Sequence, residues 1–305
     1  MSDRSAWGRR AALQTGAALA ASGASLLWPA APALAEAPAR RAQPQEQPAA
    51  LPSLALIALT RLAFGPRPGQ FDFDTFAARP GATDADKLYD FIDWQLNPNF
   101  GDDPDYLARR TAAGFATLGK SLPQLWQDHV RNATGTNANN IRLQPVRETR
   151  ADTLLRAVYS RWQLVEVLVH FWHNHFSVYG WDSAIAPVFV HYDRDVIRAN
   201  ALGNFRTFIE AVAKSTAMLF YLDNATSQGA QFNENFAREL CELHTLGAEN
   251  YLGVGNPMAV NQIPAPHDGQ PINEGYVDND VYEVARCLTG WRVNDGTGGA
   301  PGNDG

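Results

Sequence analysis

Cysteine is scarce in this chain of 305 residues, which contains only Cys241 and Cys287. At most one disulfide bridge is therefore possible. In an oxidising compartment the two residues could pair. Both fall on segments with a helical pattern, however, where cysteine is also a good small core residue. The sequence leaves both alternatives open.

Standard catalytic signatures are also missing. The chain has no phosphate-binding loop, no dinucleotide fingerprint, no H-E-x-x-H zinc motif and no nucleophile elbow. It lacks C-x-x-C-H as well, which argues against covalently attached haem. Strand-like alternation and hairpin dipeptides are scarce, and no internal repeat is found. These absences leave helical patterns and a few polar clusters to indicate fold and function.

Residues 1–35 have the layout of a cleavable export signal. Basic residues come first, an Ala-rich apolar stretch follows, and a small-x-small site stands at Ala33–Ala35. The pair Arg9 and Arg10 resembles the start of a twin-arginine signal. An ordinary secretory signal and an uncleaved anchor are the alternatives. We expect the protein to be exported, to the periplasm or to the outside of the cell.

Removal of this segment would leave an acidic chain. The whole sequence has 25 Lys and Arg against 32 Asp and Glu. Residues 1–35 contain three Arg and one Asp, which leaves 22 basic and 31 acidic side chains and a net charge of −9. Such a surface repels nucleic acid and anionic membranes. We expect no nucleic-acid partner and, because no other stretch is apolar enough, no membrane span after signal cleavage.

The remaining sequence predicts an all-α, multi-helix, bundle-like domain. Residues 36–50 are rich in Pro, Ala and Gln and indicate a disordered leader. Helical patterns then fill residues 51–292, and the longest runs from Pro145 to about His173. The Gly-rich tail 293–305 ends without a closing element. We therefore expect the helical domain to be truncated at its C-terminal end.

Local signals place several helix boundaries. Asp103, which stands before Pro104, and Ser121 are predicted N-caps. The polar segment 130–143 is predicted to be a loop. Further helices are expected near residues 188–199, 204–220, 232–246 and 280–291.

The segment "HFWHNHFSV", residues 170–178, places three histidines within six positions. At about 100° per residue, Glu166, His170 and His173 share one stripe of a helix that is otherwise apolar nearly all round. His175 falls on the opposite side and joins them only if the helix ends just before it. A Glu/His stripe inside a helical bundle is how carboxylate-bridged metal sites are built. The alternative is that these histidines are buried hydrogen-bonding residues between core helices.

A second candidate stretch is "NENFARELCELHTLG", residues 233–247. Glu239 and Glu242 form a paired-carboxylate face on the predicted helix, whereas His244 points elsewhere. Two close carboxylates could hold a divalent cation, or share a proton as acid and base. The alternative is an ion pair, since Arg238 lies four residues before Glu242.

Four stretches resemble, in their order, the bacterial domain of unknown function 1800 family: "LTRLAFGPRP", "FWHNHFSV", "YLDNATSQGAQFNENFARELCELHTLG" and "DVYEVARCLTGW". The resemblance covers roughly residues 51–292. It implies a mainly helical fold and an exported protein, commonly encoded beside a second exported family, but no assigned reaction. By motif position, the residues characteristic of that family are here Trp172, His175, Asn235, Arg238, Glu239, Glu242 and Trp291.

This chain departs from the family pattern in three places. Cys241 stands where methionine or another apolar residue is expected. An insert of about residues 253–276 separates the third stretch from the fourth. Family domains also continue well past the final motif. A site that needs ligands from that further part would therefore be incomplete here.

Two functions agree with these patterns. The first is an exported metal-dependent enzyme, with a divalent metal as its cofactor and Arg238 as the residue that orients an anionic substrate. The second is a non-catalytic partner or assembly protein in which the same residues form a buried polar network. Its partner would be a co-exported protein. The candidate metal ligands are Glu166, His170, His173, His175, Glu239 and Glu242.

Overall fold

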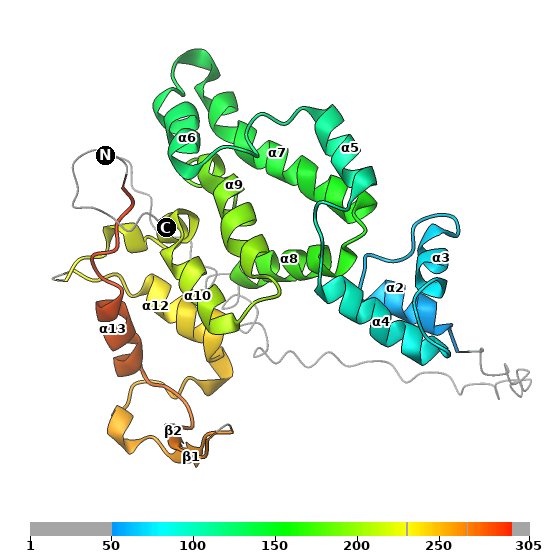
Figure 1. The fold of residues 1–305 in the computed structure, drawn as a ribbon. Coiled ribbons are helices and arrows are strands. Elements are labelled where there is room, and N and C mark those ends of the chain that lie inside the picture. The colour runs from blue at the N-terminus through cyan, green and yellow to red at the C-terminus, as the bar shows by residue number, and fades with distance from the viewer. Residues whose placement is uncertain (1–50, 230, 267, 295–305) are drawn as a thin grey trace, which may run out of the picture. The chain divides into compact units, whose positions relative to one another are not determined.

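A computed structural model of the chain describes residues 51–229, 231–266 and 268–294 (Figure 1). The predicted export signal and leader, and most of the Gly-rich tail, lie outside these residues. The described part is mainly helical and contains one small two-stranded sheet, so the prediction of a mostly α-helical fold is confirmed. In this part of the chain, no helix is both long and apolar enough to cross a membrane.

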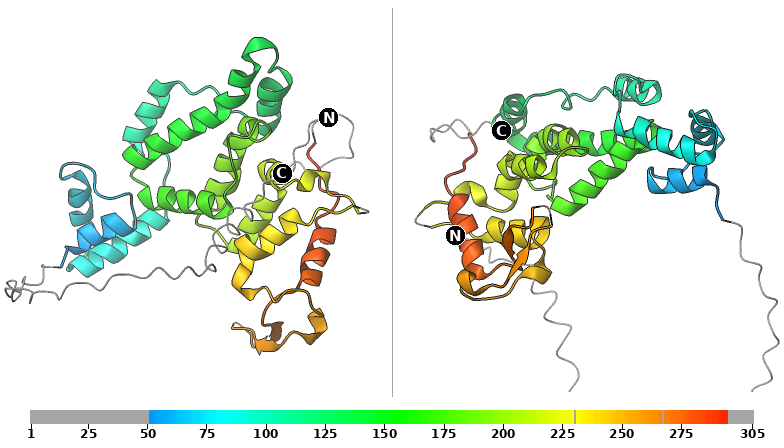
Figure 2. Two further views of the ribbon diagram at one scale, coloured as in Figure 1. Left: turned by 180° about the vertical axis from the view of Figure 1, so that it is seen from behind. Right: turned by 60° about the horizontal axis from the view of Figure 1, so that its bottom comes forward.

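The first three helices form a group of their own, as both views of the ribbon show (Figures 1 and 2). They are α2 (Leu54–Arg61), α3 (Phe71–Ala77) and α4 (Asp84–Leu96). Thr83 begins α4 with a capping box, because its hydroxyl accepts from the backbone N–H of Asp86 while that carboxylate accepts from the backbone N–H of Thr83. The group packs around the buried side chains of Ala58, Leu59, Phe76 and Phe91.

The next helices are α5 (Pro104–Ala113), α6 (Leu122–Trp126), η1 (Gln127–Arg131), η2 (Gly135–Asn137) and α7 (Ala138–Tyr159), where η denotes a 3₁₀- or π-helix. The predicted loop 130–143 is wrong in its second half, since α7 starts within it and carries Pro145 inside the helix. Proline cannot bond the carbonyl of Ile141, four residues earlier. His129 Nδ1 donates to that carbonyl instead, at 2.8 Å. The buried histidine thus satisfies the acceptor that proline leaves free.

The long helix predicted from Pro145 to about His173 is in fact two helices. α7 ends first, and α8 spans Gln163–Phe176. Asp103 makes no capping bond to α5 and acts at this break instead. Its Oδ2 accepts from the hydroxyl of Ser160 at 2.6 Å and its Oδ1 from the backbone N–H of Arg161 at 3.1 Å. The apolar periodicity continues across the break because the residue that fixes it lies 57 positions away in the sequence.

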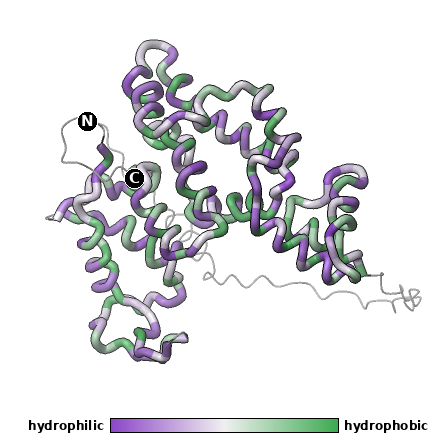
Figure 3. The backbone as a smooth tube through the Cα atoms, in the orientation of Figure 1, coloured by the Kyte–Doolittle hydropathy of each residue, from purple (hydrophilic) through white to green (hydrophobic). Residues whose placement is uncertain are grey.

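The helices that follow surround a core of apolar side chains. They are η3 (Ala186–Val188), α9 (Phe189–His191), η4 (Tyr192–Arg198), α10 (Phe205–Lys214) and α11 (Thr216–Tyr221). Val165, Val169 and Phe176 of α8 enter this core together with Tyr192 and Phe208. Polar and apolar residues alternate along these helices in the hydropathy view (Figure 3). Burial of one apolar face on each helix holds the group together.

The last part contains the sheet. Its elements are η5 (Asn224–Thr226), α12 (Asn235–Glu239), η6 (Leu240–Thr245), η7 (Ala248–Asn250), η8 (Pro257–Ala259), β1 (Gln262–Pro264), β2 (Pro271–Asn273) and α13 (Asp278–Cys287). The strands are antiparallel, with Ile263 opposite Ile272, and lie within the insert expected near 253–276. α12 and α13 pack against each other. Cys241 is buried and Cys287 is exposed, and both thiols are free, so the disulfide alternative is wrong.

The segments η4 and η6 are π-helices. A π-helix bonds residues five apart, so its turn is longer than that of an α-helix. Residues five apart then come together: Arg198 Nε donates to Asp193 Oδ2 at 2.8 Å, and Thr245 Oγ1 donates to the backbone carbonyl of Leu240 at 2.6 Å. A projection at 100° per residue does not hold in these segments.

Candidate functional site

Glu166, the centre of the predicted metal stripe, is buried and bound to arginine. Its side chain is 2% exposed. Its Oε1 and Oε2 accept from Nη1 of Arg198 at 2.9 and 2.8 Å, and Nη1 of Arg156 lies 3.7 Å from Oε1. Both oxygens therefore face a guanidinium, whereas the sequence predicted a metal ion at this carboxylate.

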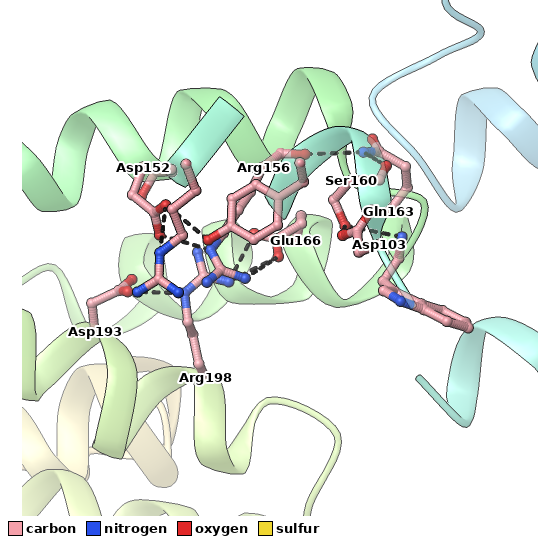
Figure 4. Close-up of polar contacts among 12 residues, drawn as sticks. Asp103, Asp152, Arg156, Ser160, Gln163, Glu166, Asp193 and Arg198 are labelled. Atoms are coloured by element: carbon pink, nitrogen blue, oxygen red, sulfur yellow. Dashed lines mark hydrogen bonds and ion pairs between the residues drawn. The ribbon is translucent and has the colours of Figure 1, made fainter. Parts of the chain in front are cut away.

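Asp152, on α7, is a second buried carboxylate, and it shares Arg156 with Glu166 (Figure 4). Its Oδ1 accepts from the hydroxyl of Tyr106 at 2.8 Å, and its Oδ2 accepts from Nε of Arg156 at 2.8 Å. Arg110 approaches Oδ1 at 3.7 Å. Burial raises the pKa of the Tyr106 hydroxyl, so this group remains a proton donor to the carboxylate.

Asp193, on η4, is the third carboxylate. Its Oδ2 accepts from Arg198 Nε at 2.8 Å, and its Oδ1 lies 2.9 Å from Nε2 of His173. Burial acts to raise the pKa of Asp193, but the charge of Arg198 and the hydrogen bond from His173 together bring it well below its usual range. An ionised carboxylate only accepts hydrogen bonds, so Nε2 of His173 is the donor.

These groups make one ion-pair network that joins four helices, α5, α7, α8 and η4. Its three carboxylates are matched by three guanidinium groups, so its charges balance. One donor, Nη2 of Arg198, is buried with no hydrogen-bond partner in the described part of the chain. The network consists of Tyr106, Arg110, Asp152, Arg156, Glu166, His173, Asp193 and Arg198.

The other two histidines of α8 lie outside the ion-pair network. His170 is exposed, and its ring lies 3.2 Å from the side-chain amide nitrogen of Asn174. The helix continues to Phe176, so the condition for His175 to join the stripe is not met. His175 faces a different neighbour: its Nε2 lies 3.3 Å from the carbonyl oxygen of His244.

His244, which the helical projection turned away from its carboxylate neighbours, forms a pair with His175. The two rings have centroids 5.9 Å apart. His244 is 4% exposed, and its Nδ1 has no hydrogen-bond partner among the described residues. Burial, and then the proximity of His175, lowers the pKa of His244 to about 4, so its imidazole is neutral at pH 7. Buried polar atoms without a partner are rare in folded proteins, and Nδ1 of His244 is one of a few among the described residues.

Arg238 lies among three carboxylates. Its Nη1 is 3.4 Å from Glu242, and its Nη2 is 3.5 Å from Glu234 and 3.1 Å from Asp278. The ion pair of Arg238 with Glu242, which the sequence left as the alternative to a cation site, is therefore confirmed. Glu239 also has a partner in the structure. Glu242 therefore faces the guanidinium of Arg238. The positive charge of Arg238 is in turn compensated by Glu242, Glu234 and Asp278.

The structure does not gather the predicted ligands into one site. Within residues 51–229, 231–266 and 268–294, no group of three or more His, Cys, Asp or Glu side chains is arranged to hold a metal ion. The stripe predicted on α8 holds for two of its three members, because Glu166 and His173 point into the protein together, whereas His170 is exposed. Their partners Asp193 and Arg198 were not predicted, because these two residues are five apart and lie on one face only when the helix is a π-helix.

A cavity of about 630 Å³ was also missed. It lies between α2–α4 and the junction of α7 with α8, and we name it the α2–α4 cavity. Residues 64–67, which belong to the family stretch "LTRLAFGPRP", line it. Other lining residues are Leu59, Ala63, Phe71, Asp72, Thr75, Ala78, Arg79, Phe91, Trp94, Gln95, Ala157, Val158, Arg161 and Gln163.

Comparison with known families agrees with the motif resemblance. The family model described as "Protein of unknown function (DUF1800)" matches residues 57–304, well over half of the chain. No curated protein and no solved structure matches it. The mainly helical fold agrees with what the four stretches imply. The chain therefore belongs to the DUF1800 family of proteins of unknown function.

Proposed function

We propose that the protein is an exported, non-catalytic partner protein, and that the His and Glu residues of α8 have a structural role in the packing of its helices. The observation that carries this proposal is the contact of both Glu166 oxygens with Arg198, at 2.9 and 2.8 Å. A carboxylate held in this way already has its charge compensated by a guanidinium, which a metal ion would have to displace. Breaking such a buried pair is costly, which favours a structural role.

The ion-pair network explains how α8 keeps its position. Hydrogen bonds from Arg198 on η4 reach Glu166 on α8, and those from Arg156 reach Asp152 on the same helix, α7. Tyr106 adds α5 through the same aspartate. A balanced network inside the protein specifies one arrangement of helices, because any other arrangement would leave charges buried without partners.

An exposed aromatic surface on α8 and α10 supports the partner role. Phe171 is 53% exposed and Phe205 is 41% exposed, although both are large apolar residues. Trp172 lies between them, with ring centroids 4.9 Å from Phe171 and 5.7 Å from Phe205. Exposed aromatic groups of this kind are enriched at protein–protein interfaces. We propose that a co-exported protein docks on Phe171, Trp172 and Phe205.

A photo-crosslinking experiment tests this partner role. A benzophenone amino acid at Phe171 should give one specific adduct in cells that express the full chain with its own N-terminus. The same amino acid at Tyr89 on α4, which is 74% exposed, is the matched control. In these cells, Arg9→Lys/Arg10→Lys should keep the chain and the adduct out of the exported fraction. Equal adducts at both positions would contradict the docking surface.

Metal analysis of the purified protein separates this proposal from the enzyme alternative. We expect no stoichiometric Zn, Fe, Mn or Cu, and we expect Glu166→Gln to lower the free energy of unfolding by roughly 3 kcal/mol. His170→Gln, at an exposed position of the same helix, is the control and should change it by less than about 0.5 kcal/mol. One metal ion per chain that is lost in a folded Glu166→Gln variant would overturn the proposal.

The metal-dependent enzyme remains a second candidate because of one observation. The buried Nδ1 of His244 has no hydrogen-bond partner in the described residues, and its ring lies 5.9 Å from that of His175. Imidazole nitrogens are suitable ligands for Zn or Fe. If this candidate is correct, bound metal should disappear in both His175→Ala and His244→Ala, while His170→Ala retains it.

A further inference from the structure

The α2–α4 cavity has the size and the lining of a small-molecule site. Its volume of about 630 Å³ falls inside the usual range for such sites, roughly 300–1,000 Å³. Leu59, Phe91 and Gln95 are buried and form its inner wall, whereas Phe64 and Phe71 are exposed and form its rim. A binding site of this kind is mostly apolar and carries a few polar groups that orient the ligand.

The polar groups of the cavity are mainly arginines. Arg67, Arg79 and Arg161 line it, together with a single carboxylate, Asp72. The complete chain, in contrast, has a net charge of −7. Each of these arginines also has one acidic partner, so an anionic ligand is favoured by the guanidinium N–H groups that these pairs leave unused and not by a surplus of charge.

Arg67 has little capacity left for a ligand. Its Nε and Nη2 donate to Asp72, at 3.1 and 2.5 Å, and its Nη1 donates to the carbonyl of Tyr159 at 3.5 Å. Its guanidinium also stacks over the ring of Phe71 at 4.7 Å. Arg67 thus fixes the wall of the cavity, and the binding of an anion falls to the other two arginines.

Arg79 and Arg161 each use one side-chain nitrogen for an acidic partner, and their other side-chain N–H groups make no hydrogen bond to the described residues. Arg79 uses its Nε for Asp90, and Arg161 uses its Nη1 for Asp102 at 2.9 Å. Within the described residues, no hydrogen bond engages the two terminal nitrogens of Arg79. Its guanidinium lies over the ring of Trp94 at 4.9 Å, which holds it against the wall of the cavity. A guanidinium bound along one edge can still receive a carboxylate on another edge.

Aromatic side chains form the neighbouring wall. Phe91 lies between Phe76 and Trp94, with ring centroids 5.6 and 5.9 Å away, and Trp94 in turn lies 4.8 Å from Trp162. A ligand ring would extend this row by the tilted contacts that aromatic groups prefer. A flexible acyl chain would gain only apolar burial from the same wall.

We propose that the α2–α4 cavity binds a small aromatic carboxylate, held at its charged end by Arg79 and Arg161 and at its ring by Phe91 and Trp94. Nothing in this assignment depends on the docking surface of Phe171, Trp172 and Phe205, because those residues do not line the cavity. Failure of one proposal therefore leaves the other intact.

Calorimetric titration of the full chain with 3-phenylpropionate tests the ligand class. We expect one site per chain, and at least tenfold weaker binding of the uncharged 3-phenylpropionamide, since charge-assisted hydrogen bonds are lost. Acid and amide that bind equally, or an acid that does not bind, would overturn the proposal. Decanoate that binds more tightly than 3-phenylpropionate would overturn the aromatic assignment.

Two matched variants test the location. Arg79→Gln should weaken binding of 3-phenylpropionate about tenfold or more. Arg109→Gln is the control, because Arg109 also stacks on an aromatic ring, that of Tyr159 at 3.8 Å, but does not line the cavity. We expect it to bind as the unaltered protein does. Ala157→Trp, which fills the cavity from α7, should abolish binding while circular dichroism shows an intact fold. Loss of affinity in Arg109→Gln to the same degree, or unchanged affinity in both other variants, would refute the location.

Discussion

The ion-pair network and the α2–α4 cavity use the same residue types for different ends. In the network, three carboxylates meet three guanidinium groups, and Glu166 and Arg198 are 2% and 12% exposed at the side chain. In the cavity, Arg79 and Asp90 pair at 23% and 32% exposure, beside an open volume of about 630 Å³. Both arrangements pair their charges, but the first does so inside the protein, whereas the second leaves guanidinium N–H groups beside a cavity.

This difference shows what decides the role of an arginine. Where carboxylates and guanidinium groups are equal in number and water is excluded, the energetic cost of leaving a charge alone makes the pair structural. Where N–H donors exceed the acceptors next to a cavity, an external anion can satisfy them. Substitutions in the two regions should therefore act on different quantities.

The largest effect should come from Arg198→Met. The substitution leaves Glu166 and Asp193 buried without their main cation, and we expect the free energy of unfolding to fall by about 3–5 kcal/mol. Urea denaturation measures it. Arg286→Met is the matched control: Arg286 pairs with Glu283 at 2.9 Å, but on the surface, so its loss should cost less than about 1 kcal/mol.

If Arg198→Met does not fold, the double variant Glu166→Gln/Arg198→Met provides the second measurement. It removes one of the two stranded charges, and the free energy of unfolding should partly recover. Equal destabilisation by Arg198→Met and Arg286→Met would remove the distinction between buried and exposed pairs on which the comparison depends.

Tyr106→Phe should have an intermediate effect. It deletes the hydroxyl that donates to Asp152 at 2.8 Å and leaves the carboxylate with its two arginines. Loss of a hydrogen bond to a buried charge costs about 2 kcal/mol. Thermal unfolding of this variant beside Tyr89→Phe, which changes an exposed tyrosine, gives the measurement. A change as small as that of Tyr89→Phe would show that Asp152 does not need this donor.

Arg79→Gln should have the smallest effect on stability, although it should have a large effect on binding. It removes a half-exposed ion pair and a stacking contact with Trp94 at 4.9 Å, together worth about 1 kcal/mol or less. Urea denaturation without ligand measures it. A loss close to that of Arg198→Met would mean that Arg79 belongs to the architecture, and the contrast between the two regions would fail.

Some features were readable from local sequence. Ser121 caps α6 by accepting from the backbone N–H of Gln124, as expected from the residue type and its position before an apolar run. The stripe on α8 turned Glu166 and His173 inward together, because α8 is a regular α-helix and its period of 3.6 residues holds there. Arg238 and Glu242 pair at i and i+4 for the same reason.

Other features had no local signal. The break between α7 and α8 depends on Asp103, whose carboxylate reaches Ser160 across 57 residues of sequence. The helical projection turned His244 away from Glu239 and Glu242, but nothing in the local pattern placed it beside His175, whose ring lies 5.9 Å away. Neither a side chain that reaches from another helix nor a change in helical period appears in a pattern of polar and apolar residues.

The sequence by itself determined the mainly helical fold, the family and the inward face of α8, because helical period, capping and motif order are properties of neighbouring residues. Only the tertiary structure decided that Glu166 meets Arg198 instead of a metal-binding set, and that three arginines share a cavity. The free energy of a buried charge depends on the distance to its partner through space. That distance is set by how the helices pack.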